Sequence, residues 1–451
     1  MVVDVLTRPE PYLFFINKVL VTINSIGLFL LGVFTYRFSK NIYLSLLIQL
    51  SPFTSIEIYY GLIIVTPENF IIFVCICFIG IIIYYLYRID IHMKQPLKFV
   101  LILGLVCGLG LASKLYFIPL IVIPLTIIKG FKNSIIFLFT FVLSFLIFIS
   151  PALSHFDYFL IWVKDLFINS GKHGGGESNI INTSSFLKNV IMIFTKDYIF
   201  GLAYLFTLIT LLTKKLLYKK HRDLNLKKIT MVLTGIFITF TFQIIIVGKH
   251  YSQYYMLPSF MLSVLAITLS AYIFSSLITK YQTGFKLEYL TIPLIAIFAS
   301  WGILQIILSY NEGDLQRKDA MEALYFVRDN YPEALVISSF GTANPQCALA
   351  FASQYGSGQS QSYRNLLSQM YSSKIFYNQW RNVFYTTFDP SDLKNTLLSS
   401  KTILVVLVST FGSIEQFIKT FKEITQKSDV TYTQLFSNKK MEFIYELKIN
   451  H

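Results

Sequence analysis

Long, uninterrupted apolar runs are the feature that most constrains this chain. Runs of about 18 or more apolar residues are typical of helices that cross a bilayer. The sequence predicts ten spans, of which the fourth and fifth are short, at roughly 12–35, 42–63, 67–87, 98–113, 115–129, 133–152, 198–213, 229–247, 254–279 and 289–310. Only 14% of the residues are charged, against about 25% in soluble domains. We therefore predict an α-helical polytopic membrane protein with about ten transmembrane helices.

The loops between these spans alternate in charge. One set of loops holds 16 Lys or Arg residues, and the other holds seven together with eight acidic residues. Because cytoplasmic loops are enriched in Lys and Arg, the second set is predicted to lie outside the cytoplasmic membrane. After Tyr310, 14 basic residues face 13 acidic ones, so nearly all of the net charge of +14 belongs to the membrane part. That distribution argues against a nucleic-acid-binding domain.

Residues 311–451 have a different character. The segment 319–332 has helical periodicity, and 413–427 is predicted to be an amphipathic helix. Segments 334–340, 401–409 and 441–449 are predicted strands, and the polar stretch 356–366 is predicted to be a loop. We therefore divide the chain into a multi-span domain, 1–310, and an extracytoplasmic α/β domain, 311–451. No phosphate-binding glycine motif or nucleophile elbow is evident in the second.

Two acids on either side of the short loop between the second and third spans are candidate catalytic residues. These are Glu57 and Glu68, within LSPFTSIEIYYGLIIVTPENF (50–70). Glu68 also has a structural explanation. Thr66 is a good N-cap, Pro67 suits a first helical position, and an acid in the first turn complements the helix dipole.

Basic and aromatic residues in other outward loops are candidates for binding a phosphate or a sugar. Lys114 lies at the pivot between the fourth and fifth spans, where its alternative role is an interfacial anchor. The segment VGKHYSQYYMLPSF (247–260) offers Lys249, His250 and Tyr254, for which an aromatic belt is the alternative. In the first span, Asn17, Lys18 and Asn24 are predicted to face the interior of the bundle.

Four stretches together resemble the polytopic glycosyltransferases of the GT-C class, which use lipid-linked sugars. The resemblance is to the branch of the protein O-mannosyltransferases and aminoarabinose transferases. The stretches are RPEPYLFFINKVLVTINSIGLFLLG (8–32), LSPFTSIEIYYGLIIVTPENFIIFV (50–74), GLGLASKLYFIPLIVIPL (108–125) and GKHYSQYYMLPSFML (248–262).

The resemblance implies an enzyme that moves a sugar from a polyprenyl-phosphate carrier to an extracytoplasmic lipid, glycan or protein, with inversion. It implies that an acid at Glu68 acts in catalysis and that Lys114, Lys249 and His250 lie near the carrier phosphate. Arg8, at the start of the first stretch, joins the predicted substrate-binding residues. A divalent metal is left open as a cofactor. The partners expected are membrane lipid, the lipid-linked donor and an unidentified acceptor of the cell envelope.

In one respect the chain departs from this family. Members have an earlier span, followed by an outward loop with the principal catalytic acid. We expect this chain to lack both, since Asp4 and Glu10 are its only acids before the first predicted span. Three alternatives therefore stay open: a transporter or flippase, a polysaccharide polymerase or ligase for lipid-linked sugars, and an inactive truncated relative.

Overall fold

The structure is a computed structural model of the 451-residue chain. It describes residues 9–63, 67–90, 95–150, 153, 156–169, 183–217, 224–249, 251–281, 287–339, 375–379, 382–386, 388–408, 412–439 and 442–449. The chain divides into two compact units. A helical unit comprises Leu13–Ile307, and a second unit comprises Met1–Tyr12 with Leu308–His451. The predicted boundary at residue 310 falls inside one continuous helix, α14 (Glu288–Asn330).

Seven of the described helices are long and apolar enough to cross a membrane. The helical membrane class predicted from the apolar runs is thus confirmed. Besides α14, these helices are α2 (Pro9–Ser39), α5 (Pro67–Arg88), α8 (Phe131–Phe148), α11 (Tyr198–Leu217), α12 (Leu224–Lys249) and α13 (Leu257–Tyr281).

The other three predicted spans are short or broken. Residues 42–63 form α3 (Ile42–Gln49), η1 (Ser51–Thr54) and α4 (Ile56–Ile63), with Pro52 in the break. The predicted spans 98–113 and 115–129 become α6 (Leu97–Ser113), η2 (Leu115–Ile121) and α7 (Val122–Ile127). Proline lacks the N–H that continues an α-helix, which accounts for the interruptions near Pro52 and Pro119.

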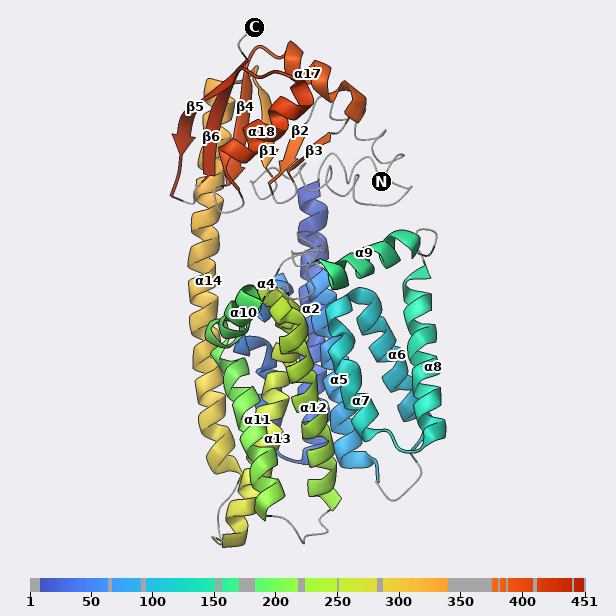
Figure 1. Ribbon diagram of the computed structural model, residues 1–451. Coiled ribbons are helices and arrows are strands. Elements are labelled where there is room, and N and C mark those ends of the chain that lie inside the picture. Colours follow the sequence, from blue (N-terminus) through green and yellow to red (C-terminus); the bar gives the residue numbers. More distant parts are fainter. Residues whose placement is uncertain are drawn as a thin grey trace. The chain divides into compact units, whose positions relative to one another are not determined.

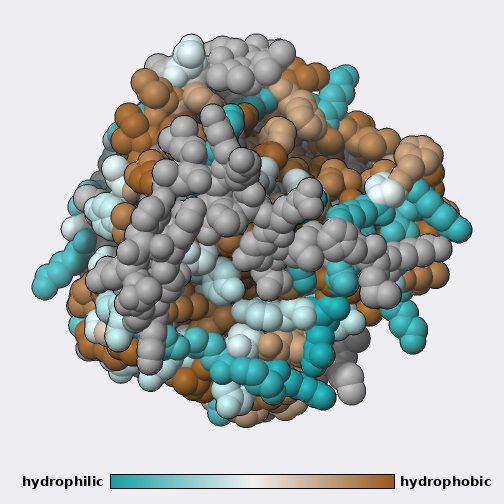
Figure 2. Space-filling model, turned by 90° about the horizontal axis from the view of Figure 1, so that it is seen from below, coloured by the Kyte–Doolittle hydropathy of each residue, from teal (hydrophilic) through white to brown (hydrophobic). Residues whose placement is uncertain are grey.

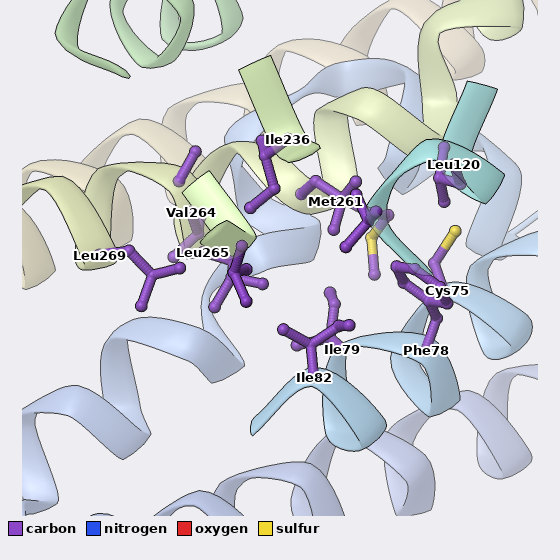
Figure 3. Packing of buried hydrophobic residues seen from close by; sticks show 14 of the residues in the cluster. Cys75, Phe78, Ile79, Ile82, Leu120, Ile236, Met261, Val264, Leu265 and Leu269 are labelled. Atoms are coloured by element: carbon purple, nitrogen blue, oxygen red, sulfur yellow. The ribbon is translucent and has the colours of Figure 1, made fainter. Parts of the chain in front are cut away.

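Helix α13 forms the centre of the helical unit. Its candidate span is 89% buried within the protein, whereas that of α8 is 11% buried. Figure 3 shows Met261, Val264 and Leu265 of α13 among side chains of α5 and α12. The buried thiols of Cys75 and Cys107 belong to this core.

Close helix packing is clearest between α6 and α8. A Cβ on Gly104 would lie 2.9 Å from the Cβ of Thr140, and one on Gly108 would lie 2.5 Å from the carbonyl oxygen of Phe141. The hydroxyl of Ser144 donates to the carbonyl of Leu105 at 2.8 Å. Small residues four apart allow two membrane helices to approach closely, and Gly104 and Gly108 serve that purpose here.

The connections place short helices at one end of the helical unit. Helices α9 (Phe156–Ile168) and α10 (Thr183–Lys196) lie at the same end as α4 (Figure 1). At the other end, the buried ammonium of Lys228 on α12 donates to the carbonyls of Leu86 and Ile89, both at 2.9 Å. It thereby caps the C-terminus of α5. Seen from this end, hydrophilic side chains lie among hydrophobic ones (Figure 2).

The C-terminal unit contains a six-stranded mixed sheet in the order β3-β2-β1-β4-β6-β5. Strands β2 and β4 pair with β1 in parallel, and the other pairs are antiparallel. The strands are β1 (Leu335–Ser339), β2 (Ile375–Asn378), β3 (Val383–Thr386), β4 (Ile403–Val408), β5 (Val430–Ser437) and β6 (Glu442–Ile449). The helices beside them are α17 (Leu393–Ser399) and α18 (Ile414–Thr425), with η6 at Pro390–Asp392.

The predicted α/β character of this part is confirmed. Strands β1, β4 and β6 and helix α18 match the prediction, whereas β2, β3 and β5 were missed. Strands β2 and β3 have only four residues each, too few for a periodicity to show. Strand β5 is an edge strand in which only Val430 is buried, so its sequence lacks the run of buried apolar residues that identifies a strand. The predicted loop 356–366 lies outside the described residues.

Candidate functional site

Glu68 and Lys114 form an ion pair. The Nζ of Lys114 lies 3.0 Å from Oε1 of Glu68, and the two side chains are 30% and 13% exposed, respectively. Glu68 lies in the first turn of α5, and Lys114 follows the last residue of α6. The backbone at Lys114 is extended, and its N–H donates to the carbonyl of Gly110, so the pivot predicted between α6 and η2 is present. A predicted acid and a predicted cation thus meet.

Tyrosines surround this pair on one side. The hydroxyl of Tyr116 donates to Oε1 of Glu68 at 3.3 Å. The rings of Tyr116 and Tyr255 lie 5.6 Å apart, and that of Tyr254 packs edge-on against Tyr255 at 4.5 Å. Tyr254 and Tyr255 belong to η5 (Gln253–Met256), which precedes α13. Tyr254, which the sequence analysis singled out, is therefore connected to Glu68 only through the rings of Tyr255 and Tyr116. Sequence reasoning missed Tyr116.

A buried pair of amides fixes the helix end that carries Glu68. Asn24 of α2 donates through Nδ2 to Oδ1 of Asn69 at 2.5 Å. Asn69 donates in turn to the carbonyl of Leu62 at 2.7 Å. Of the three polar residues predicted to face the interior from the first span, Asn24 is buried. Asn17 is partly exposed and Lys18 is exposed.

Glu57 lies in α4, next to an acid that the sequence did not single out. That acid is Asp197, which precedes α11 and is 6% exposed. Neither residue lies in the seven candidate spans. Burial, together with the charge of Asp197, raises the pKa of Glu57 to about 7. Burial raises the pKa of Asp197 to about 6, although hydrogen bonds from Ser55 and Phe200 act in the opposite direction.

Lys249 contacts a different element. Its ammonium donates to the carbonyls of Leu166 at 2.8 Å and Phe167 at 2.5 Å, at the C-terminal end of α9. A cation there satisfies carbonyls that lack a partner within their helix. Its predicted contact with a carrier phosphate stays a prediction. Arg8 and His250 lie outside the described residues.

The candidate residues lie at one end of the helical unit, but they form three separate contacts and not a single cluster. Glu68 meets Lys114, Glu57 meets Asp197, and Lys249 meets α9. Within the described ranges, no group of three or more His, Cys, Asp or Glu side chains could hold a metal ion.

A cavity of about 210 Å³ lies elsewhere in the helical unit. Thr35, Ile83, Leu86 and Leu269 are among its lining residues, most of which belong to the middle of α13 and the last turns of α5. Leu86 is in the last turns of α5, whereas Glu68 is in the first, so the cavity is remote from the acids. Its lining is mostly apolar and does not resemble a phosphate site.

The structure thus defines a polytopic helical membrane protein with a mixed-sheet unit at its C-terminal end. No protein-family model and no curated protein matches the sequence. Among solved structures, the chain is similar to ArnT from Cupriavidus metallidurans, crystallised with undecaprenyl phosphate. The similarity covers 95% of this chain and 83% of that chain, with 9% sequence identity and a TM-score of 0.47.

Proposed function

We propose that this protein is a membrane glycosyltransferase that moves a sugar from a polyprenyl-phosphate carrier to an acceptor outside the cytoplasm. The observation that carries the proposal is the ion pair between Glu68 and Lys114, with Tyr116 beside it. These three residues lie in two of the four stretches on which the family resemblance rests. The basic loops at the opposite end support an extracytoplasmic position for the site.

The chemistry proposed is a single displacement. An acceptor hydroxyl attacks the anomeric carbon, a new C–O bond forms, and the bond from that carbon to the phosphate oxygen breaks. The electron pair leaves with the phosphate, and the anomeric centre inverts. A carboxylate takes the proton of the hydroxyl, and a nearby cation stabilises the charge that develops on the phosphate.

The geometry suggests different roles for Lys114 and Glu68. Lys114 is 30% exposed, so its ammonium can meet a phosphate as well as Glu68. Glu68 is held by an ion pair and a hydrogen bond, which suits a carboxylate that orients its neighbours. Glu57 has no such cationic partner among the described residues, which leaves its carboxylate available for proton transfer.

The test uses the full chain in lipid nanodiscs. Wild-type protein is incubated with polyprenyl-phosphate hexoses and pentoses, and the release of free polyprenyl phosphate is followed by mass spectrometry. We expect release that depends on an added membrane or glycan acceptor. Binding of polyprenyl phosphate alone is measured by thermal shift, and Lys114→Gln should weaken it about tenfold or more. Failure of the wild type to bind polyprenyl phosphate would refute the proposal, as would passage of the lipid-linked sugar across a bilayer without cleavage.

A further inference from the structure

Two acidic residues from segments far apart in the sequence, Glu57 and Asp197, are linked by one short hydrogen-bonded chain through Ser55. The N–H of Glu57 donates to Oγ of Ser55 at 3.3 Å. The hydroxyl of Ser55 donates to the carboxylate of Asp197, and the N–H of Phe200 donates to Oδ1 of Asp197 at 3.0 Å. Ser55 and Asp197 therefore cap the N-termini of α4 and α11, which meet at this point.

The capping of two helices explains the side chains of Ser55 and Asp197, but it gives no role to the carboxylate of Glu57. In the part of the chain that the structure describes, no Lys or Arg forms an ion pair with either carboxylate. Among the described residues, the titratable groups that interact with the pair are its own two members and Tyr251. Asp197 is buried and Glu57 is half-buried. Two such carboxylates that lack a cation cannot both be ionised at low cost, so one of them holds a proton near neutral pH.

The hydrogen bonds decide which of the two takes that proton. Asp197 accepts from Ser55 and from Phe200, and both bonds stabilise its anion. No described residue donates to the side chain of Glu57. Asp197 is therefore the member that remains ionised, and Glu57 takes up and releases the proton. Burial raises the pKa of Glu57 to about 7, with the charge of Asp197 as the second cause. That value suits a base which works near neutral pH.

Glu57 also lies close to the Glu68 site. Gly61 is four residues, or one helical turn, after Glu57 and so lies on the same face of α4. A Cβ on Gly61 would be 3.5 Å from the Cβ of Glu68. The distance along the helix from Glu57 to Gly61 is about 6 Å. In addition, the buried hydroxyl of Tyr251 has no partner among the described residues, and it interacts electrostatically with both Glu57 and Asp197.

We propose that Glu57 is the base that accepts the proton of the acceptor hydroxyl, and that Asp197 is the positioning residue which keeps Glu57 basic. This inference rests on the proposed function for the identity of the reaction. In the step, the new C–O bond forms as the proton passes to the carboxylate of Glu57. The electron pair of the broken bond leaves with the carrier phosphate, and Asp197 stays ionised throughout.

Infrared titration of the full chain in nanodiscs tests the pair without any sugar. The wild type should show a protonated carboxyl band that disappears with a midpoint near the pKa of about 7. Glu57→Gln should remove this band. Asp197→Asn keeps a side-chain oxygen that can accept from Ser55 and Phe200 but removes the charge. The midpoint of the Glu57 titration should therefore fall by about one pH unit. Asp157→Asn replaces an exposed acid in the first turn of α9 and should change nothing.

Transfer kinetics supply the second readout. The acidic limb of the kcat/KM profile should move in Asp197→Asn in the same direction as the infrared midpoint. A purely capping role for Asp197 predicts no movement of either quantity, and that result would overturn the inference. Asp197→Ser, which also retains a capping side chain, serves if the Asn variant does not fold.

The two proposals fail in different ways. An unchanged infrared band in Glu57→Gln refutes the carboxylate pair, even if the wild type transfers sugar. A wild type that titrates as expected but transfers no sugar refutes the proposed function, and with it the role of Glu57 as a base.

Discussion

The Nζ of Lys114 and Oε1 of Glu68, 3.0 Å apart, join the start of α5 to the end of α6. This one contact admits two explanations. A structural ion pair holds α5 against the end of α6. A functional pair presents a cation to a phosphate on the side where Tyr116 and Tyr255 pack.

A charge swap separates these explanations. The double variant Glu68→Lys with Lys114→Glu rebuilds the ion pair but exchanges the positions of the two charges. We expect thermal stability to recover to within about 1 kcal/mol of the wild type, because the attraction is restored. Transfer should remain about 100-fold below the wild type, because the cation is misplaced for the phosphate. Recovery of both stability and transfer would show that the pair is structural.

The amides of Asn24 and Asn69 should matter for stability. Asn69→Ala removes the group that pairs with both Asn24 and the carbonyl of Leu62. We expect a loss of about 1–3 kcal/mol, because buried polar groups lose their partners. Denaturation in detergent measures it. Thr22→Ala is the control, since the hydroxyl of Thr22 is exposed and bonds only within its own helix. Equal stability in the two variants would contradict the prediction.

Gly108 should tolerate no side chain. In Gly108→Ala the new Cβ would meet the backbone oxygen of Phe141 at 2.5 Å, and a backbone atom cannot rotate away. We expect α6 and α8 to separate, at a cost of about 1–3 kcal/mol. Gly80→Ala is the matched control, because its nearest atom is the Cδ1 of Leu31 at 3.7 Å. Comparison of the two melting temperatures checks the prediction, which fails if they fall equally.

Stability should depend on pH through Glu57 and Asp197. Both folded pKa values are raised above those of free carboxyl groups, to about 7 and about 6. An acid with a raised pKa stabilises the fold below its unfolded pKa, and this contribution is lost as pH rises through the folded value. Thermal stability should therefore fall between about pH 4.5 and pH 7.

Glu57→Gln provides the check on that pH dependence. The variant should be more stable than the wild type at pH 8, by no more than about 3 kcal/mol, and should have a flatter pH profile. Melting curves at closely spaced pH values measure the difference. A wild-type profile that is flat across this range would contradict the assigned pKa values.

Lys249 distinguishes a helix cap from a phosphate ligand. Lys249→Gln keeps a donor for the carbonyls of Leu166 and Phe167 but removes the positive charge. If the residue only caps α9, binding of polyprenyl phosphate should be unchanged. The family resemblance predicts weaker binding, by about tenfold. A thermal shift titration with polyprenyl phosphate decides between the two.

Local sequence signals anticipated the helices but not their partners. The apolar runs predicted the long helices well, and Pro67 begins α5 as its fixed φ angle favours. The break between Ser113 and Lys114 was also predicted correctly. Three predicted spans are interrupted or short, because hydropathy alone does not register the effect of prolines on the hydrogen-bond ladder.

The site was harder to predict because its contacts join distant segments. Glu68, Lys114 and Glu57 were singled out, yet nothing local pairs Glu68 with Lys114 or Glu57 with Asp197. Asp197 looks like an ordinary helix cap in sequence, and Asn69 looks like a neighbour of the more interesting Glu68. Tyr116 is one aromatic residue in an apolar stretch. Only the packing of α4, α5, η2 and α11 reveals these relationships.

Helix α12 carries a lysine contact near each end, and this has a consequence for the surrounding lipid. Lys228 holds the end of α5, and Lys249 holds the end of α9. The two residues are separated by about 30 Å of helix, which matches the hydrocarbon thickness of a typical bilayer. The length of α12 between the two lysines therefore matches one membrane thickness. In a markedly thinner membrane, one ammonium would have to leave its carbonyls or the helix would have to tilt, so bilayer thickness becomes a variable that tunes this protein.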